Sequence, residues 1–313
     1  MSNHTMSNDA RTQWREILSR PVDADPFDPR SSVVELEIGA ASRTGRLQSR
    51  NSDHYLAVRF SRVQETVLTS LSAADLPPRF EEAAYAMVVA DGLGEVAAGA
   101  RASRVAVSAL AHLSIQYGRW NVRVDRDVSD IFRQGEFFYR RANDAVREAA
   151  QADLRLADMA TSMTALYIAG DDLFFAHVGH SRAFLFRDGV LTRMTMDHTV
   201  DEQHRMTGRP MTSGRAKRDF THMVTEAIGG RPVLPEVDIE HLKLACSDRL
   251  LLCTNGLTDV VTEEQIADVL ALGRSPQEDC LRLIELAAAA EAPDDVTMLI
   301  ADYSVGRGSR MPE

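Results

Sequence analysis

The sequence contains few cysteines, no long apolar run and no excess of basic side chains. Its three cysteines, Cys246, Cys253 and Cys280, lack metal-ligand spacing, and an odd count without an N-terminal signal segment indicates buried thiols in a reducing compartment. The longest apolar run, at 83–90, is too short to cross a bilayer. We therefore expect a cytoplasmic protein with no membrane partner.

Positive charge is scarce, since 35 Lys and Arg residues stand against 46 Asp and Glu residues and give a formal net charge of -11. This excess of acid disfavours a nucleic acid partner, because neutralisation of phosphates drives that kind of binding. The carboxylates either gather around cations or keep the chain in solution, and the composition is compatible with both. With 44% hydrophobic and 26% charged residues, the chain is otherwise ordinary globular material.

The chain divides into one long central region and two short ends. Residues 1–31 are predicted to be an N-terminal extension, because the segment RPVDADPFDPR contains three prolines and is typical of an extended linker. Residues 32–305 show continuous strand and helix patterns without an internal repeat, which predicts a single domain. Residues 306–313 are expected to be a disordered tail, and we expect a monomer.

Strand patterns dominate the central region, interrupted by two pairs of helices. The expected helices span 96–115, 127–151, 262–272 and 275–290, the last two with Thr262 and Ser275 as N-caps. Tight turns between the strands at 162–194 force antiparallel pairing, since parallel neighbours need long crossovers. Residues 61–84 are expected to form a loop, and residues 198–224 look irregular. The pattern predicts an α+β fold, a sandwich of two antiparallel sheets flanked by pairs of helices.

Four apolar strands end or begin next to a polar side chain. These positions are Asp53, Asp91, Asn255 and Asp294. Strand ends can converge at one edge of a sandwich, and clustered carboxylates there need a compensating charge, which hard divalent cations provide through oxygen ligands. Gly92 follows Asp91 and leaves room for its own carbonyl to reach a cation. The alternative is that each position is an ordinary turn, which Asp-Gly after a strand usually is.

A series of motifs runs through the central region in a fixed order. They are QSRNSD, VVADGLG, TSMTALYIAG, VGHSRAFLFRDG, TMDHT, TEAIGG, CTNGLTD and PDDVT. Over Val33 to Tyr303 this order resembles the metal-dependent Ser/Thr protein phosphatases of the 2C type, the PPM family. That family has a segment ending in Glu-Asp, an Asp-Gly after a strand, a Gly-Asp-Ser-Arg hairpin, a Ser-Asp-Gly-Leu and an Asp-Asn-Val-Thr. Its fold of two antiparallel sheets flanked by helices agrees with the strand pattern.

The resemblance implies a role for each strand-end residue. Asp91 would bridge two Mg²⁺ or Mn²⁺ ions, with the Gly92 carbonyl on one of them, and Asp294 and Asn255 would hold the other. Asp53 would orient a metal-bound water for in-line attack on phosphorus. The expected substrate is a phosphoserine or phosphothreonine protein, the product of a Ser/Thr kinase.

Several metal-site positions depart from the family pattern. Ser52 stands where the family has a Glu, and Asn255 replaces an Asp ligand, although its carbonyl oxygen can still bind a cation. His180 replaces the Asp of the Gly-Asp-Ser-Arg hairpin, which can serve a third metal, and it can itself ligate Mn²⁺. By analogy Asp259 is either a further third-metal ligand or a surface carboxylate. Each lost charge weakens the attraction for a cation.

The expected phosphate contacts also differ. Gln48 stands where the family has a phosphate-holding Arg, and either Arg46 or Arg50 is a substitute in a shifted register. A basic stretch lies at the position of the family's mobile flap, and it is either a phosphoprotein-binding surface or a solvated loop. Its members are Arg205, Arg209, Arg215, Lys217 and Arg218.

Two further readings of the function stay open at this point. The substituted positions are compatible with a pseudophosphatase that binds a phosphoprotein without turnover. The segment TNGLTD also resembles phosphatases that act on regulators of sigma factors, although GHSRAFLFRDG favours the 2C type. His177, on an apolar strand, is expected to be a core histidine rather than a ligand.

Overall fold

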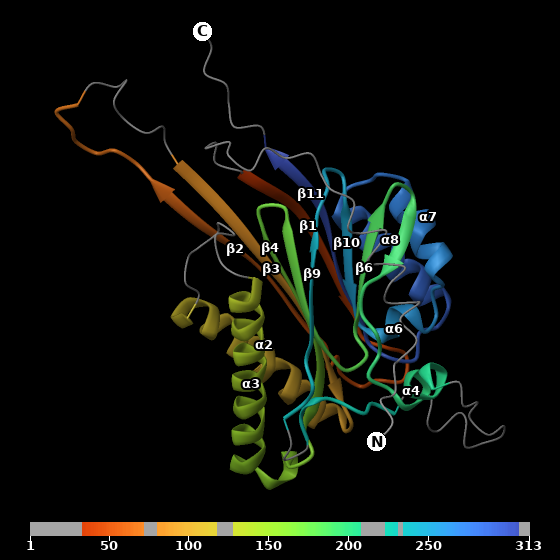
Figure 1. Cartoon of the computed structure of the whole chain (residues 1–313). Helices are drawn as coiled ribbons and strands as arrows, with labels where there is room; N and C mark the ends of the chain where they lie inside the picture. Colours follow the sequence, from red (N-terminus) through yellow and green to blue (C-terminus); the bar gives the residue numbers. More distant parts are fainter. Residues whose placement is uncertain (1–32, 72–79, 118–127, 208–222, 231–233, 307–313) are drawn as a thin grey trace.

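The computed structural model describes residues 33–71, 80–117, 128–207, 223–230 and 234–306 (Figure 1). The predicted extension at 1–31 lies outside the described residues, as does the predicted tail beyond Gly306. The first described strand begins at Val33 and the last ends at Gly306.

Two antiparallel sheets form the centre of the structure. The first sheet has the order β1 (Val33–Arg43), β11 (Val296–Gly306), β10 (Arg249–Cys253), β6 (Arg182–Arg187) and β7 (Val190–Arg193). The second has the order β2 (His54–Gln64), β3 (Phe80–Leu93), β4 (Ala160–Ala169), β5 (Asp172–Val178) and β9 (Asp238–Lys243), and β8 (Ile228–Gly229) pairs with β4. The predicted sandwich of antiparallel sheets is confirmed.

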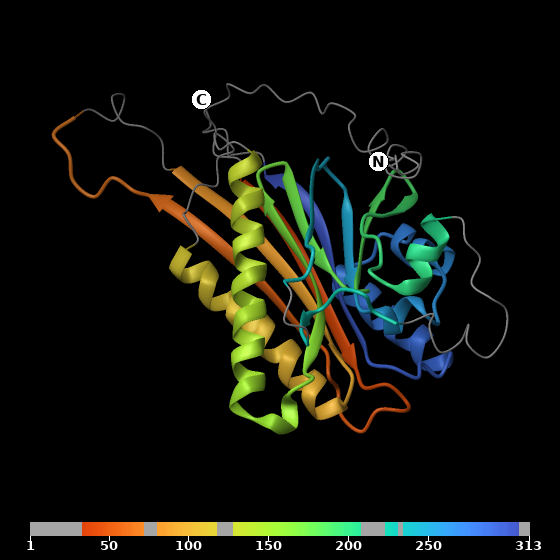
Figure 2. The ribbon, with the colours of Figure 1, turned by 60° about the horizontal axis from the view of Figure 1, so that its bottom comes forward.

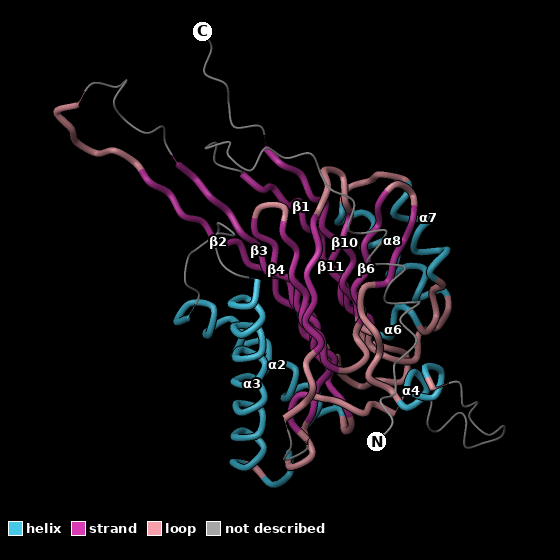
Figure 3. Tube along the Cα trace, viewed as in Figure 1, coloured by secondary structure: helices cyan, strands magenta, loops and turns pink. Residues whose placement is uncertain are grey.

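Helices cover both outer faces of the sandwich (Figures 2 and 3). On the second sheet lie α2 (Val96–Tyr117) and α3 (Val128–Ala152), and on the first lie α6 (Asn255–Thr258), α7 (Glu263–Ala271) and α8 (Pro276–Ala289). A short 3-10 turn, η2 (Leu154–Leu156), follows α3. Thr262 and Ser275 cap α7 and α8 through reciprocal bonds with Gln265 and Glu278, which confirms both predicted N-caps.

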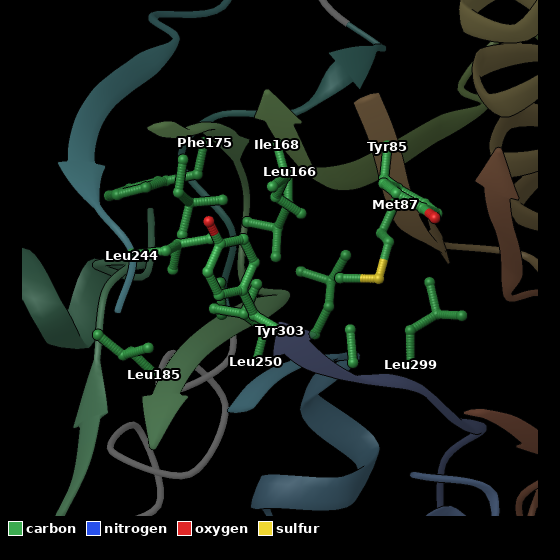
Figure 4. Packing of buried hydrophobic residues seen from close by; sticks show 14 of the residues in the cluster. Tyr85, Met87, Leu166, Ile168, Phe175, Leu185, Leu244, Leu250, Leu299 and Tyr303 are labelled. Atoms are coloured by element: carbon green, nitrogen blue, oxygen red, sulfur yellow. The ribbon is translucent and has the colours of Figure 1, made fainter. Parts of the chain in front are cut away.

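Apolar side chains fill three layers of core. Between the sheets, residues such as Met87, Leu166, Leu250 and Tyr303 pack together, as Figure 4 shows. The other two layers join each sheet to its own helices. Because the sheets are covered on both faces, β5 and β10 are buried along their whole length, which explains why they are mostly apolar.

Two local predictions were wrong. The loop expected at 61–84 is shorter, because β2 continues to Gln64 and β3 already begins at Phe80. As the edge strand of its sheet, β2 carries exposed polar residues such as Ser61, which hide the strand pattern. The region expected to be irregular at 198–224 includes helix α4 (Val200–Met206), whose N-cap is Thr199.

The alternating strand directions bring several chain segments to one end of the sandwich. β3 and β10 end there, and β2 and β11 begin there, next to α6 (Figure 1). Among the described residues, none of the helices combines the length and the apolar character that crossing a membrane requires.

Candidate active site

Asp53 and Asp91 form a buried carboxylate pair at this end of the sandwich. Asp53 immediately precedes β2 and is 7% exposed, and Asp91 lies near the end of β3 and is 5% exposed. Burial raises the pKa of Asp53 to about 7, against the opposing effect of hydrogen bonds from Thr297 and Thr254. The pKa of Asp91 is raised well above its usual value by burial, and then by the charges of Asp53 and Asp294.

The two oxygens of Asp53 have different surroundings. Oδ2 accepts a hydrogen bond of 2.9 Å from the Thr254 hydroxyl. Oδ1 is buried and receives no hydrogen bond from a donor among the described residues, and the charges of Asp53 and Asp91 repel each other. A cation would relieve the same repulsion.

Asn255 begins α6 and is 6% exposed. Its Nδ2 donates a hydrogen bond of 3.0 Å to Asp259 Oδ2, and this bond fixes the orientation of the amide. Its Oδ1 is buried and has no hydrogen-bond partner in the described part of the chain. A buried acceptor without a donor is costly, and a cation ligand is one way to satisfy it.

Asp294 precedes β11 and lies close enough to Asp91 for its charge to raise the pKa of that residue. Its Oδ1 accepts hydrogen bonds from the Asp295 amide at 2.9 Å and from Gln48 Nε2 at 3.0 Å. The structure thus gives Gln48 a carboxylate partner. Arg50, on the same loop, is exposed.

The other predicted site residues are distributed around this centre. His180 Nδ1 lies 3.6 Å from Asp91 Oδ2, and both side chains are buried. Gly92, which follows Asp91, is half-buried. Arg205, on α4, pairs with Glu202. The predicted contact Arg209 lies outside the described residues, together with the rest of the basic stretch: Arg215, Lys217 and Arg218.

His177 is completely buried on β5. Its Nδ1 lies 2.8 Å from the Thr164 hydroxyl, and burial together with the charge of His198 lowers its pKa to about 3. A histidine that stays neutral in the sheet interior agrees with the expectation of a core residue.

The donor set fits a hard divalent cation. Burial and the charges of Asp53 and Asp294 raise the pKa of Asp91, and Asp53 and Asn255 each hold a buried oxygen that lacks a donor among the described residues. Mg²⁺ and Mn²⁺ prefer oxygen ligands of these kinds. Within the described ranges, no cluster of three or more His, Cys, Asp or Glu side chains by itself forms a metal site, and the proposed set includes an amide and a backbone carbonyl.

Three contacts of this site were missed by sequence reasoning. They are the bond from Thr254 to Asp53, the bond from Asn255 to Asp259, and the bonds that Asp295 accepts from the Gly45–Ser52 loop. The doublet of Asp294 and Asp295 was the only signal in the sequence that pointed to the last of these.

Comparison with known proteins gives a consistent result. The family model described as Protein phosphatase 2C matches residues 56–296. The serine/threonine protein phosphatase PstP of Mycobacterium tuberculosis is 33% identical over 226 residues, covering 71% of this chain but only 42% of that protein. The chain therefore spans less than half the length of this curated relative.

Solved structures agree with this match. A crystal structure of the M. tuberculosis serine/threonine phosphatase PstP/Ppp is 29% identical and superposes with a TM-score of 0.65, covering 85% of this chain and 98% of that one. The PstP catalytic domain in complex with two manganese ions is likewise 29% identical, with a TM-score of 0.64 and coverages of 87% and 99%.

Proposed function

Because this chain belongs to the protein phosphatase 2C family, we propose that it is a metal-dependent phosphatase that removes phosphate from phosphoserine and phosphothreonine in proteins. The main support for this proposal is the buried carboxylate pair of Asp53 and Asp91, which is influenced by the charge of Asp294 and is bonded to Thr254, the chain neighbour of Asn255. The relatives named as serine/threonine phosphatases support the choice of substrate.

The residues that would hold Mg²⁺ or Mn²⁺ are Asp91, the Gly92 carbonyl, Asn255 and Asp294. When bound, the ions would acidify water and neutralise the charge of the phosphoryl group. Asp53 is held by Thr254 through Oδ2, which leaves Oδ1 to accept a hydrogen bond from the attacking water. In this proposal Asp53 orients the nucleophile.

Other charged groups would assist around this centre. His180, beside Asp91, would bind a further cation or hold a proton near the leaving group. Asp259 would orient the Asn255 amide by accepting its hydrogen bond. Since Gln48 is engaged with Asp294, the exposed Arg50 is the proposed contact for the substrate phosphate or its acidic neighbours. Arg205 and Arg209 are proposed as weaker substrate contacts.

The cellular setting follows from the same proposal. A Ser/Thr kinase would supply the phosphorylated substrates, and the protein would act in signalling as a monomer. All three cysteines are free thiols, which supports the cytoplasm as a reducing compartment.

The test of this function is phosphate release from phosphothreonine, phosphoserine and phosphotyrosine peptides. We expect release from the first two with Mn²⁺ or Mg²⁺, and none in EDTA. Binding of the peptides without release at any metal concentration would instead identify a pseudophosphatase. Equal release in EDTA would contradict the metal-dependent chemistry.

The metal-free protein is expected to lose the stability contribution of Asp53 as the pH rises. The folded pKa of about 7 lies above the usual 3.8, so this contribution is complete below about pH 4 and is lost as the pH rises through about 7. In EDTA, the unfolding temperature of Asp53→Asn should therefore increasingly exceed that of the wild type between about pH 4 and pH 8. Excess Mn²⁺ should reduce this difference in unfolding temperature. A difference that does not depend on pH would contradict the raised pKa of Asp53.

Arg50→Glu is expected to raise KM for a phosphopeptide with acidic flanks roughly tenfold, because it reverses an exposed charge beside the site. KM for a small aryl phosphate should change far less. Arg140→Glu, an exposed reversal on α3, is the matched control and should leave both values unchanged. An equal effect of Arg50→Glu on both substrates would remove Arg50 from the substrate-binding surface.

A further inference from the structure

We propose that Asp295 is a positioning residue whose carboxylate holds the loop that leads to Asp53 against the segment that carries Asp294 and packs beside Asn255. This inference rests on the proposed function of those three residues. Asp295 itself is 2% exposed and immediately precedes β11.

The carboxylate of Asp295 binds the loop between β1 and β2 at two points. Its Oδ1 accepts a hydrogen bond of 2.9 Å from the Gly45 amide. Its Oδ2 accepts one of 2.7 Å from the Ser52 amide and one of 2.9 Å from the Ser52 hydroxyl. Because Ser52 directly precedes Asp53, these bonds fix the backbone from which the Asp53 side chain extends.

The backbone of Asp295 orders the other two segments. Its amide donates to Asp294 Oδ1 at 2.9 Å. The two neighbouring carboxylates therefore have different partners, since that of Asp295 binds the loop before Asp53. Its carbonyl lies against Gly256, where an added Cβ would come within 2.0 Å of the oxygen. Only a glycine permits this approach, and Gly256 is the chain neighbour of Asn255. Asp53, Asn255 and Asp294 are thus the chain neighbours of Ser52, Gly256 and Asp295, the residues that contact one another here.

The loop also packs directly on Asp294. A Cβ at Gly45 would lie 2.3 Å from the Asp294 carbonyl carbon, so the two backbones are in close contact. Further along the same loop, the Arg46 and Leu47 amides donate to the Ala292 and Pro293 carbonyls at 2.9 and 3.1 Å. The loop at 45–52 and the segment at 292–295 are therefore closely packed, and the Asp295 carboxylate bonds the two together. Loss of these bonds would shift Asp53 relative to Asp294.

Asp295 differs from the purely structural buried carboxylates of this protein. Asp279, for example, is fully buried between the guanidinium groups of Arg249 and Arg274. In the described part of the chain, Asp295 forms no ion pair, and its oxygens take only neutral donors. Its negative charge is felt instead by Asp53 and Asp91. A residue that orders the ligands and adds negative charge beside them is suited to raise cation affinity.

The pattern of substitutions agrees with this role. Relative to the family pattern, a carboxylate is missing at Ser52 and an additional one is present at Asp295, where the family pattern has Asn. These two side chains are the ones that bond to each other. The carboxylate of Asp295 therefore lies directly beside the side chain at which the family pattern has its own carboxylate.

The test is Asp295→Asn in the full chain, measured by calorimetric titration of Mn²⁺ and by phosphopeptide turnover. An amide has one acceptor oxygen in place of two, so the Gly45 or the Ser52 amide loses its acceptor and faces an NH₂ group. We expect the dissociation constant of Mn²⁺ to rise roughly tenfold or more, as for other residues that hold metal ligands in place. Ser52→Ala, which removes one of the three bonds, should shift it in the same direction by less.

Asp302→Asn is the matched control, because it makes the same change on β11 at a position that binds Arg249 at 2.6 Å. It should lower the unfolding temperature and leave the Mn²⁺ constant unchanged. Wild-type affinity and turnover in Asp295→Asn, or an equal weakening in Asp302→Asn, would overturn the inference. If Asp295→Asn fails to fold, an unchanged constant in Ser52→Ala overturns it. If the wild-type chain neither binds Mn²⁺ nor releases phosphate, the proposed function itself fails.

Discussion

Asp91→Asn is expected to reduce phosphopeptide turnover by about a thousandfold or more at an Mn²⁺ concentration that saturates the wild type, while the metal-free fold keeps or gains stability. The residue is proposed to contact both cations, and a loss of this size corresponds to about 4 kcal/mol of transition-state stabilisation. The stability change has the opposite sign because burial and the charges of Asp53 and Asp294 raise the pKa of Asp91. A neutral amide of similar shape removes that repulsion.

Asp172→Asn provides the control for a buried carboxylate that lies away from the site. Asp172 is 1% exposed and pairs with His241 and Lys243 on β9. Its replacement should lower the unfolding temperature and leave kcat and KM nearly unchanged. Turnover close to the wild-type value in Asp91→Asn would mean that the active site has been placed at the wrong end of the sandwich.

Asn255→Asp is expected to tighten Mn²⁺ binding by about tenfold, which corresponds to about 1.4 kcal/mol. The full Coulomb attraction of a new unit charge at 4 Å is about 4 kcal/mol at an effective dielectric of 20, and solvent and side-chain rearrangement reduce it. In EDTA the same variant should be less stable, because the Nδ2 group that donates to Asp259 at 3.0 Å becomes an oxygen. Two carboxylates would then face each other.

A charge exchange separates these two effects. The double variant Asn255→Asp with Asp259→Asn keeps one amide and one carboxylate in contact, with the donor and acceptor reversed. It moves the negative charge from position 259 to position 255 and avoids the repulsion between two carboxylates. Both variants should bind Mn²⁺ more tightly than the wild type, and only the single one should be destabilised in EDTA. Destabilisation of the single variant that excess Mn²⁺ does not reverse would remove Asn255 from the proposed cation site.

The overall fold was accessible from the sequence because its signals are local. Short turns join β4 to β5 and β6 to β7 as antiparallel neighbours, and the caps at Thr262 and Ser275 mark the starts of α7 and α8. The antiparallel pairing expected across the equally short turn between β5 and β6 was wrong, because this turn crosses from one sheet to the other. The far end of β2 was not predicted, because alternate side chains along this strand are exposed and need not be apolar.

The candidate site was accessible only as a set of strand ends. Each of its four polar residues stands out because it lies where an apolar strand begins or ends. They are Asp53, Asp91, Asn255 and Asp294. Their partners could not be read from the sequence, because these contacts join residues that are distant along the chain. Ser52 and Asp295 are 243 positions apart, and Gln48 and Asp294 are 246 apart. Which amide atom of Asn255 faces Asp259 is likewise decided by folded geometry.

The most direct test of the central claim is a calorimetric titration of Mn²⁺ into the metal-free protein near neutral pH, performed in parallel on the wild type and on Asp91→Asn. We expect saturable binding to the wild-type chain and its loss in the variant, because Asp91 is the carboxylate proposed to contact both ions. No saturable binding to the wild type, or the same isotherm for both proteins, would contradict it.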